Sequence, residues 1–352
     1  MAHVLQYHTG QMLPKSPTKS DANESANVDA DVENAADSSV LLPSVIRVLR
    51  KLRDHNPSLQ RKLSHGIASI DTTDTDTNTD TGDQEGSDHS LSYWNRYEQS
   101  PMVIMDQDTN KLIGINFGGL MVRLVNVIPF LQALDEEKIE LHTINLGGTD
   151  IGMDNLCEGI QHLSVELRMS WKKLYLGGCG ISCRKGMNDF VNVLKLCPNV
   201  ETLDLRYNDF NGEDMEKLNS QLSWNECKVS ILHLEGNVVK CDGAASVGGI
   251  LSQTKDLKEL YLGANSIGVE GAKSLANGLN ENTSVVKIYL EANLIGDEGA
   301  NALSEVLLDQ TERQCKVLEK LYFDNNGIGK DAATKLGNAV NSEGLIGGSL
   351  FD

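Results

Sequence analysis

The feature that most constrains this chain is a short motif that returns at nearly constant spacing. In ELYLGANSIGVEGAKSLANGL, residues 259–279, leucines first alternate with other residues, as in a half-buried strand, and apolar residues then keep helical spacing. Eight units show this change, and the residues that close their L-x-x-L-x-L-x-x-N cores are Leu120, Thr149, Cys179, Asn208, Asn237, Asn265, Asn293 and Asn326. The intervals between these residues are 29, 30, 29, 29, 28, 28 and 33. Such a period predicts an array of strand–turn–helix units.

One unit of this kind cannot bury both its strand leucines and the apolar face of its helix. Units stacked side by side can, because their strands form a parallel sheet and their helices cover one side of it. An Asn in the turn can satisfy neighbouring backbone groups, and its loss leaves buried polar groups unpaired at about 1–3 kcal/mol each. We therefore predict a structural ladder formed by Cys179, Asn208, Asn237, Asn265, Asn293 and Asn326.

These motifs resemble the leucine-rich repeat family, in its long ribonuclease-inhibitor-like cytosolic subtype. The resemblance covers about two thirds of the chain. It implies an α/β solenoid in which a curved parallel sheet forms the concave side and helices form the convex side. Cys179 is a known alternative at the Asn position of the family, whereas Leu120 marks the first unit as a degenerate cap.

Composition divides the chain ahead of the repeats. Residues 1–95 hold 14 acidic and 8 basic side chains, and the acidic run 71–89 has too little apolar surface to offset chain entropy. We predict a largely disordered acidic tail over 1–90 and an N-terminal cap with a hairpin over 91–111. The repeat domain of eight units then covers 112–344, and a short tail covers 345–352.

Within the tail, residues 41–53 predict a basic amphipathic helix. Leu42, Val45, Ile46, Leu49 and Leu52 form its apolar stripe, beside several Arg and Lys residues. The pattern leaves several roles open. The helix could dock on the acidic solenoid, stand alone, bind a membrane surface or calmodulin-like partner, or cover the strand face as an autoinhibitory plug.

Charge and motifs limit the function. The net charge of −19 repels phosphate backbones and disfavours nucleic acid as a partner. The apolar segment 112–134 is disfavoured as a membrane span, because Arg123 near its middle costs about 2.5–3.5 kcal/mol. Seven cysteines without metal spacing, and no apolar leader, predict a reduced protein of the cytoplasm or nucleus. No metal, cofactor or catalytic constellation is predicted, so we expect no enzyme.

The strand face turned away from the helices carries the candidate binding site. Equivalent positions of stacked units align into columns about 4.8 Å apart. In the last four units they form an aromatic column of His233, Tyr261, Tyr289 and Tyr322. The residues that we predict to contact a partner are Tyr175, Asp204, Arg206, His233, Glu235, Tyr261, Tyr289, Glu291, Tyr322 and Asp324.

Tyrosine also simply suits a half-exposed strand. Against that, large amphipathic rings with charged borders are typical of interface centres. The hypothesis is a monomeric, non-catalytic recognition module for another protein. The alternative is a regulator of a small GTPase resembling the Ran GTPase-activating protein.

Overall fold

The structure is a computed structural model that describes residues 47–52, 54–56, 103–106, 111–118, 123–124, 126–312 and 318–340. All of them lie in one compact unit, Ser38–Asp352. Several predicted features fall outside the described residues: most of the 1–90 tail with the acidic run 71–89, the greater part of the 91–111 cap, the closing residue Leu120, and the end of the chain from 341 on.

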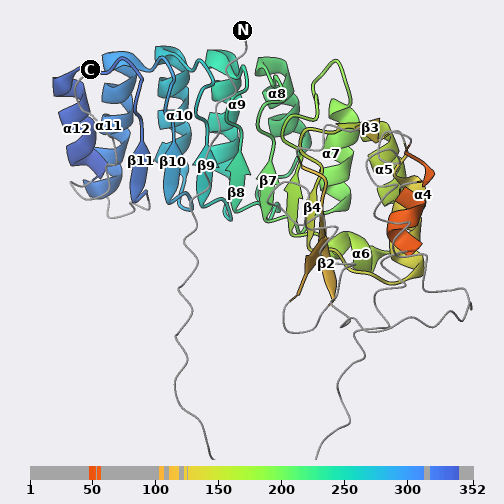
Figure 1. Ribbon diagram of the computed structural model, residues 1–352. Coiled ribbons are helices and arrows are strands. Elements are labelled where there is room, and N and C mark those ends of the chain that lie inside the picture. Colours follow the sequence, from red (N-terminus) through yellow and green to blue (C-terminus); the bar gives the residue numbers. More distant parts are fainter. Residues whose placement is uncertain are drawn as a thin grey trace, which may run out of the picture. The chain divides into compact units, whose positions relative to one another are not determined.

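Eight parallel strands, one from each predicted unit, form one sheet in the described part of the chain (Figure 1). Their order is β2-β4-β6-β7-β8-β9-β10-β11, and β1 adds an antiparallel strand at the β2 edge. The strands are β1 (Val103–Met105), β2 (Leu112–Asn116), β4 (Thr143–Asn145), β6 (Lys173–Tyr175), β7 (Thr202–Asp204), β8 (Ile231–His233), β9 (Glu259–Tyr261), β10 (Lys287–Tyr289) and β11 (Lys320–Tyr322).

Helices follow the strands and form a second layer on one face of the sheet (Figure 1). They are α4 (Ile128–Glu136), α5 (Met153–Gln161), α7 (Met187–Leu196), α8 (Gly212–Gln221), α9 (Lys240–Gln253), α10 (Val269–Glu281), α11 (Gly296–Glu312) and α12 (Lys330–Val340). No described helix covers the opposite face, which we call the open face. This alternation of a parallel sheet and a helical layer confirms the predicted fold class.

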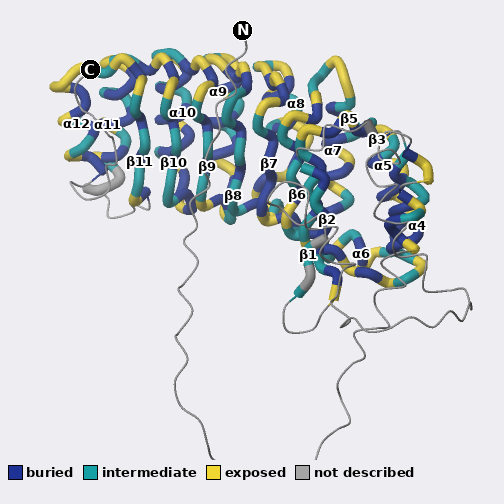
Figure 2. Tube along the Cα trace, in the orientation of Figure 1, coloured by how far each residue is buried: buried dark blue, intermediate teal, exposed yellow. Residues whose placement is uncertain are grey.

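The core lies between the two layers, where buried residues line both the strands and the helices (Figure 2). Strands pair in register, so Leu260 lies beside Ile288 and Ile288 beside Leu321. These three side chains are at most 2% exposed. Burial of one such side chain contributes about 1.5–3 kcal/mol, and each unit gains it only from its neighbours.

Two glycines allow α9 and α10 to pack closely. A Cβ on Gly248 would meet the α10 backbone at Ser274, and a Cβ on Gly278 would meet the backbone of Gly248. A larger residue at either position would have to push the helices apart. The small residues therefore set the spacing of the helical layer here, as the strand ladder sets the spacing of the sheet.

The segment 112–134 contains β2, the short strand β3 (Arg123–Leu124) and most of α4, so it is not one continuous helix. β1 and β2 form a hairpin in which the Asp106 backbone N–H donates to the carbonyl of Lys111 (2.9 Å). Among the described residues, no helix has the length and apolar character needed to cross a membrane.

Residues 47–52 are helical and pack on the first units of the solenoid. Val48, Leu49 and Leu52 are buried in the same core as the repeats. Leu52 also lines a small apolar cavity together with Phe117 and Phe130. Of the apolar stripe predicted from the sequence, Leu49 and Leu52 therefore dock on the repeats, whereas Leu42, Val45 and Ile46 lie outside the described residues.

Polar contacts hold the same segment in place. Arg47 forms a two-contact ion pair with Glu137 (2.6 and 2.9 Å). The buried side chain of Asn56 donates to the Asn126 carbonyl (2.8 Å) and accepts from the Asn126 N–H (3.0 Å). These contacts lie near β2 and α4, whereas the tyrosines of the aromatic column lie on β9, β10 and β11. Residues 47–52 and 54–56 therefore do not cover that column, which rules out the plug for this segment.

Three elements of the early units, two strands and one helix, lie outside the repeat pattern. β3 (Arg123–Leu124) and β5 (Asp150–Ile151) pair as a separate two-stranded parallel sheet. The short helix α6 (Val165–Ser170) is added between α5 and β6. These additions occur where the closing residues of the motif are not Asn, so the degenerate units are also the irregular ones.

Candidate functional site

One residue from each strand stands at the centre of the open face. The register places these residues side by side across the sheet: Asn116, Asn145, Tyr175, Asp204, His233, Tyr261, Tyr289 and Tyr322. Side chains alternate along a strand, so the residue before this one turns into the core while this one turns away from it. Equivalent residues of successive strands therefore form a row of side chains across the open face.

The aromatic column forms a continuous stack of rings. Ring centroids lie 4.2 Å apart for His233 and Tyr261, 4.0 Å for Tyr261 and Tyr289, and 4.2 Å for Tyr289 and Tyr322. The two tyrosine pairs are nearly parallel, with interplanar angles of 6°. Because the rings cover one another's faces, a partner on this face would meet their edges.

On one side of the column, a lysine neutralises the acidic group. Glu259 accepts hydrogen bonds from the Tyr261 hydroxyl (2.8 Å) and from Nζ of Lys287 (2.7 Å). Burial alone would raise the pKa of Glu259, but these bonds outweigh it and lower that pKa. Burial raises the pKa of Tyr261, and its bond to Glu259 raises it further. Glu259 is thus ionised and paired, and Tyr261 stays a neutral phenol.

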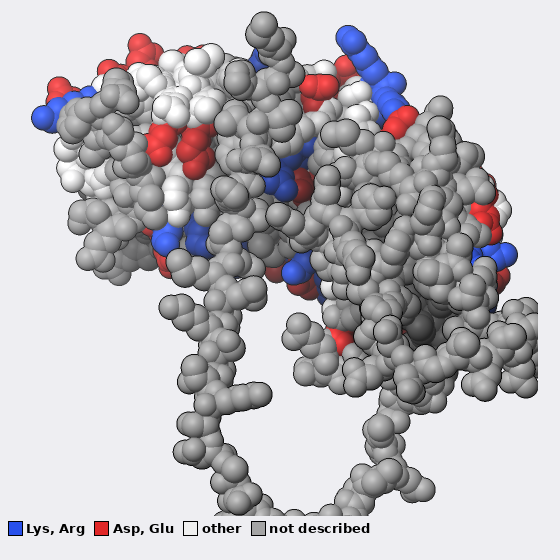
Figure 3. Space-filling model, in the orientation of Figure 1, with Lys and Arg blue, Asp and Glu red and all other residues white. Residues whose placement is uncertain are grey.

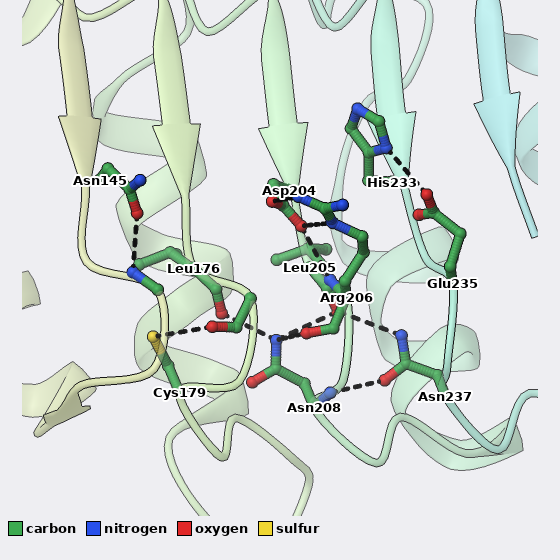
Figure 4. Close-up of polar contacts among 12 residues, drawn as sticks. Asn145, Leu176, Cys179, Asp204, Leu205, Arg206, Asn208, His233, Glu235 and Asn237 are labelled. Atoms are coloured by element: carbon green, nitrogen blue, oxygen red, sulfur yellow. Dashed lines mark hydrogen bonds and ion pairs between the residues drawn. The ribbon is translucent and has the colours of Figure 1, made fainter. Parts of the chain in front are cut away.

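On the other side, Glu235, Glu291 and Asp324 form what we call the acidic flank. Burial raises the pKa of Glu291, outweighing a bond from its own backbone N–H, and the charges of Asp324 and Glu235 raise it further. Oε1 of Glu235 lies 3.2 Å from Nδ1 of His233 (Figure 4). Its Oε2 has no hydrogen-bond partner within the described residues. One carboxylate oxygen of Glu235 thus lacks a hydrogen-bond donor in the described part of the chain, although Glu235 also interacts electrostatically with Arg206.

The two sides of the column differ visibly in charge. In the orientation of Figure 1, acidic and basic atoms gather as separate groups on opposite sides of an uncharged band over β10 and β11 (Figure 3). Lys287 and Lys320 begin β10 and β11, whereas Glu291 and Asp324 follow the ends of these two strands, so the unlike charges lie at opposite ends of each strand. A partner on this face would meet a band of ring edges between unlike charges.

Asp204 departs from the role predicted for it. Its side chain is only 5% exposed and holds the Arg206 guanidinium through two contacts of 3.0 and 2.7 Å (Figure 4). The hydrogen bond to Asp204 raises the pKa of Arg206. Asp204 therefore positions Arg206, and it is the 40% exposed arginine that the open face presents.

The ladder lies in the turns beside this face (Figure 4). Nδ2 of Asn208 donates to the carbonyls of Leu176 (2.8 Å) and Leu205 (3.1 Å), which belong to successive units. Its own backbone N–H donates to Oδ1 of Asn237 (2.9 Å). Each Asn thus bonds its own turn and that of the preceding unit, and Asn237, Asn265, Asn293 and Asn326 repeat the pattern.

The early ladder positions bond more sparsely. Sγ of Cys179 donates to the Leu146 carbonyl (3.1 Å), and Oγ1 of Thr149 donates to the same carbonyl (2.6 Å). Burial raises the pKa of Cys179 to about 11 and that of Cys197 to about 12. These thiols are poor nucleophiles at neutral pH. Within the described part of the chain, no group of three His, Cys, Asp or Glu side chains could hold a metal ion.

Tyr207 is a feature of the site that the sequence did not predict. It lies just outside the strand pattern and is 58% exposed, and a Cβ on Gly236 would collide with its ring. Gly236 has a φ of +67°, which suits glycine on a second ground. Tyr175 lies in the central row between Asn145 and Asp204, so it has no ring beside it in the register.

Comparison with known proteins gives one family match and several weak structural similarities. A family model described as "Leucine Rich repeat" matches residues 196–218 and 255–276. A leucine-rich repeat-containing protein of Legionella pneumophila, LegL7, is 17% identical, with a TM-score of 0.37, and the match covers 66% of this chain and 82% of that one.

Two plant receptors are similar at the same low level. The Arabidopsis receptor kinase HAESA, solved with the peptide hormone IDA and the co-receptor SERK1, is 16% identical, with a TM-score of 0.38 over 87% of this chain. The ectodomain of GASSHO1/SCHENGEN3 from Arabidopsis thaliana is 13% identical, with a TM-score of 0.32 over 74% of this chain. The chain spans 41% of the length of each receptor. The family match identifies leucine-rich repeats at residues 196–218 and 255–276, and the motif spacing and the in-register sheet show the same kind of unit in the neighbouring repeats.

Proposed function

We propose that this chain is a non-catalytic recognition module that binds another protein on the open face of its sheet. The observation that carries the proposal is the stack of four rings across β8, β9, β10 and β11, with no described helix over it. Stacked rings lose little conformational freedom on binding, and aromatic residues dominate interface centres. The charged borders add selectivity among partners.

The proposal extends to subtype and location. Each strand of the large sheet from β2 onward is followed by an α-helix, and most repeats are 28–30 residues long. Both features favour the ribonuclease-inhibitor-like subtype. The described cysteines are free thiols, which favours a reducing compartment, the cytoplasm or nucleus. The alternative role, regulation of a small GTPase, rests on the family resemblance alone. GTP hydrolysis by Ran-like GTPases, measured with and without the chain, tests it.

Partner capture from cell extract tests the main proposal. The full chain is compared with the triple variant Tyr261→Ala, Tyr289→Ala, Tyr322→Ala and with Tyr207→Ala, which removes an exposed tyrosine outside the column. We expect the wild type and the Tyr207 variant to capture the same partner and the triple variant to lose it. Melting curves show whether the triple variant folds, and Tyr289→Arg serves as a second variant that keeps the core intact. Retention of every partner by both column variants contradicts the proposal.

A further inference from the structure

The acidic flank indicates what kind of partner fits the open face. Resting on the proposed function, we propose that the partner presents a basic segment and places an Arg or Lys side chain over Gly263, between Glu235 and Glu291. The proposal follows from the shape of this position, from the charge around it and from the adjacent rings.

Gly263 leaves a gap in the row of side chains. Its carbonyl accepts from the Gly236 N–H (3.0 Å), and the Ala264 N–H donates to the Glu291 carbonyl (2.9 Å), so the three turns lie side by side. A Cβ on Gly263 would lie 3.7 Å from Oε2 of Glu291 and 3.9 Å from Cγ of Glu235. Oε2 of Glu291 and Cγ of Glu235 thus border a side-chain position that Gly263 leaves vacant, and the backbones of the two glutamates are about 10 Å apart, twice the strand spacing. This width suits a guanidinium or ammonium group.

The charge around the gap favours a cation. The charged neighbours that raise the pKa of Glu291 are both acidic, Asp324 and Glu235. A carboxylate oxygen of Glu235 also has no hydrogen-bond partner among the described residues. A cationic donor between the two glutamates would relieve the repulsion and supply charge-assisted hydrogen bonds. A metal ion fits less well, because the described residues bring no three such ligands together.

The aromatic column adds a surface for the rest of the side chain. Tyr261 and Tyr289 stack at 4.0 Å, so their faces are closed to a cation and their edges remain. The aliphatic stem of Arg or Lys can lie along these edges while its charged end reaches the carboxylates. The same row already holds one guanidinium, since Asp204 fixes Arg206 through two contacts on the neighbouring unit of Glu235. The open face is thus able to seat a planar cation.

Selection from a random-peptide display library on the full chain tests the inference. We expect the enriched peptides to carry Arg or Lys at a fixed position. Replacing that residue by neutral citrulline or acetyl-lysine should weaken binding about tenfold to hundredfold. The variant Glu235→Gln, Glu291→Gln should weaken binding of the parent peptide to a similar extent and remove its sensitivity to that replacement.

The matched control is Glu270→Gln, Glu298→Gln, which makes the same charge change at exposed positions of the helical layer. It should bind like the wild type, and melting curves confirm that both double variants fold. Peptides that need the tyrosines but show no preference for a cation overturn this inference and leave the proposed function standing. Failure to enrich any peptide that depends on the column overturns both.

Discussion

The first and last units of the sheet share one backbone plan and differ in what they place on the open face. In β2 and β4 the central residues are Asn116 and Asn145, whose Oδ1 atoms accept from the backbone N–H groups of Gly118 (3.0 Å) and Gly147 (2.9 Å). Their polar groups are therefore used inside the chain. In β8 to β11 the same row holds the aromatic column, beside an acidic flank in which Glu235 and Asp324 raise the pKa of Glu291.

The turns of the early units also form fewer hydrogen bonds than the turns of the late units. Asn293 donates to the Leu262 and Leu290 carbonyls and accepts from two backbone N–H groups, whereas Cys179 has one short contact, to Leu146. The early units compensate with added parts, namely the β1–β2 hairpin and the docked helix 47–52. The comparison teaches that the regular units supply a rigid platform for recognition, while the irregular units close one end of the core.

The largest expected effect is at the ladder. Asn293→Ala removes a buried amide, and two backbone carbonyls and two backbone N–H groups then lose their hydrogen-bond partner. We therefore expect the free energy of unfolding to fall by about 3–5 kcal/mol. Cys179→Ala should cost only about 1–2 kcal/mol. Urea unfolding of both variants measures the difference. Equal losses would mean that the two ends are held together in the same way.

The docked helix comes next. Leu52 is 1% exposed, so Leu52→Ala should lower the free energy of unfolding by about 2–4 kcal/mol. Lys51→Ala, an exposed change on the same helix, is the control and should cost under about 0.5 kcal/mol. Hydrogen exchange in α4 should quicken in the Leu52 variant alone. An unchanged α4 together with unchanged stability would show that the segment does not belong to the core of the first units.

The ring stack should contribute less. Tyr289 has a ring on each side, so Tyr289→Ala should cost about 1–2 kcal/mol. Tyr175 lies between Asn145 and Asp204 and has no ring beside it, so Tyr175→Ala should lower the free energy of unfolding by less than Tyr289→Ala does. Thermal unfolding of the two variants compares a stacked with an unstacked position of the same row. A larger loss at Tyr175 would speak against a cooperative stack.

The smallest expected effect is a gain in stability and concerns Glu291. The pKa of Glu291 lies above its ordinary value of 4.5 in the folded chain, so its neutral form is favoured by folding. That contribution is complete below the ordinary pKa and is lost as pH rises through the folded pKa. Glu291→Gln should therefore stabilise the chain by about 0.5–1 kcal/mol at neutral pH. The gain should vanish in acid, and Glu298→Gln should show none. Destabilisation at neutral pH would reveal a favourable partner for the carboxylate.

Much of the fold follows from the period of the sequence. Because the units recur every 28–30 residues over most of their length, the pattern predicts which residues pair, and Tyr261, Tyr289 and Tyr322 do pair in register. The alternation around Leu260 and Ile288 likewise predicts which side of each strand is buried.

The remainder depends on tertiary contacts that no local pattern encodes. The pairing of β3 with β5 arises between degenerate units. The position of helix 47–52 depends on the shape of the cavity beside Phe117 and Phe130. The burial of Asp204 depends on which way Arg206 turns, and the spacing of residues is the same for either direction.

Fluorine NMR of the chain labelled with fluorotyrosine tests the central claim, that the aromatic column is the recognition surface, most directly. A peptide selected on the chain is titrated in, and single Tyr→Phe variants assign the resonances. The account predicts that the signals of Tyr261, Tyr289 and Tyr322 shift together with one affinity while that of Tyr207 stays in place. Saturable binding that moves Tyr207 or Tyr175 and leaves the three column signals unchanged would contradict it.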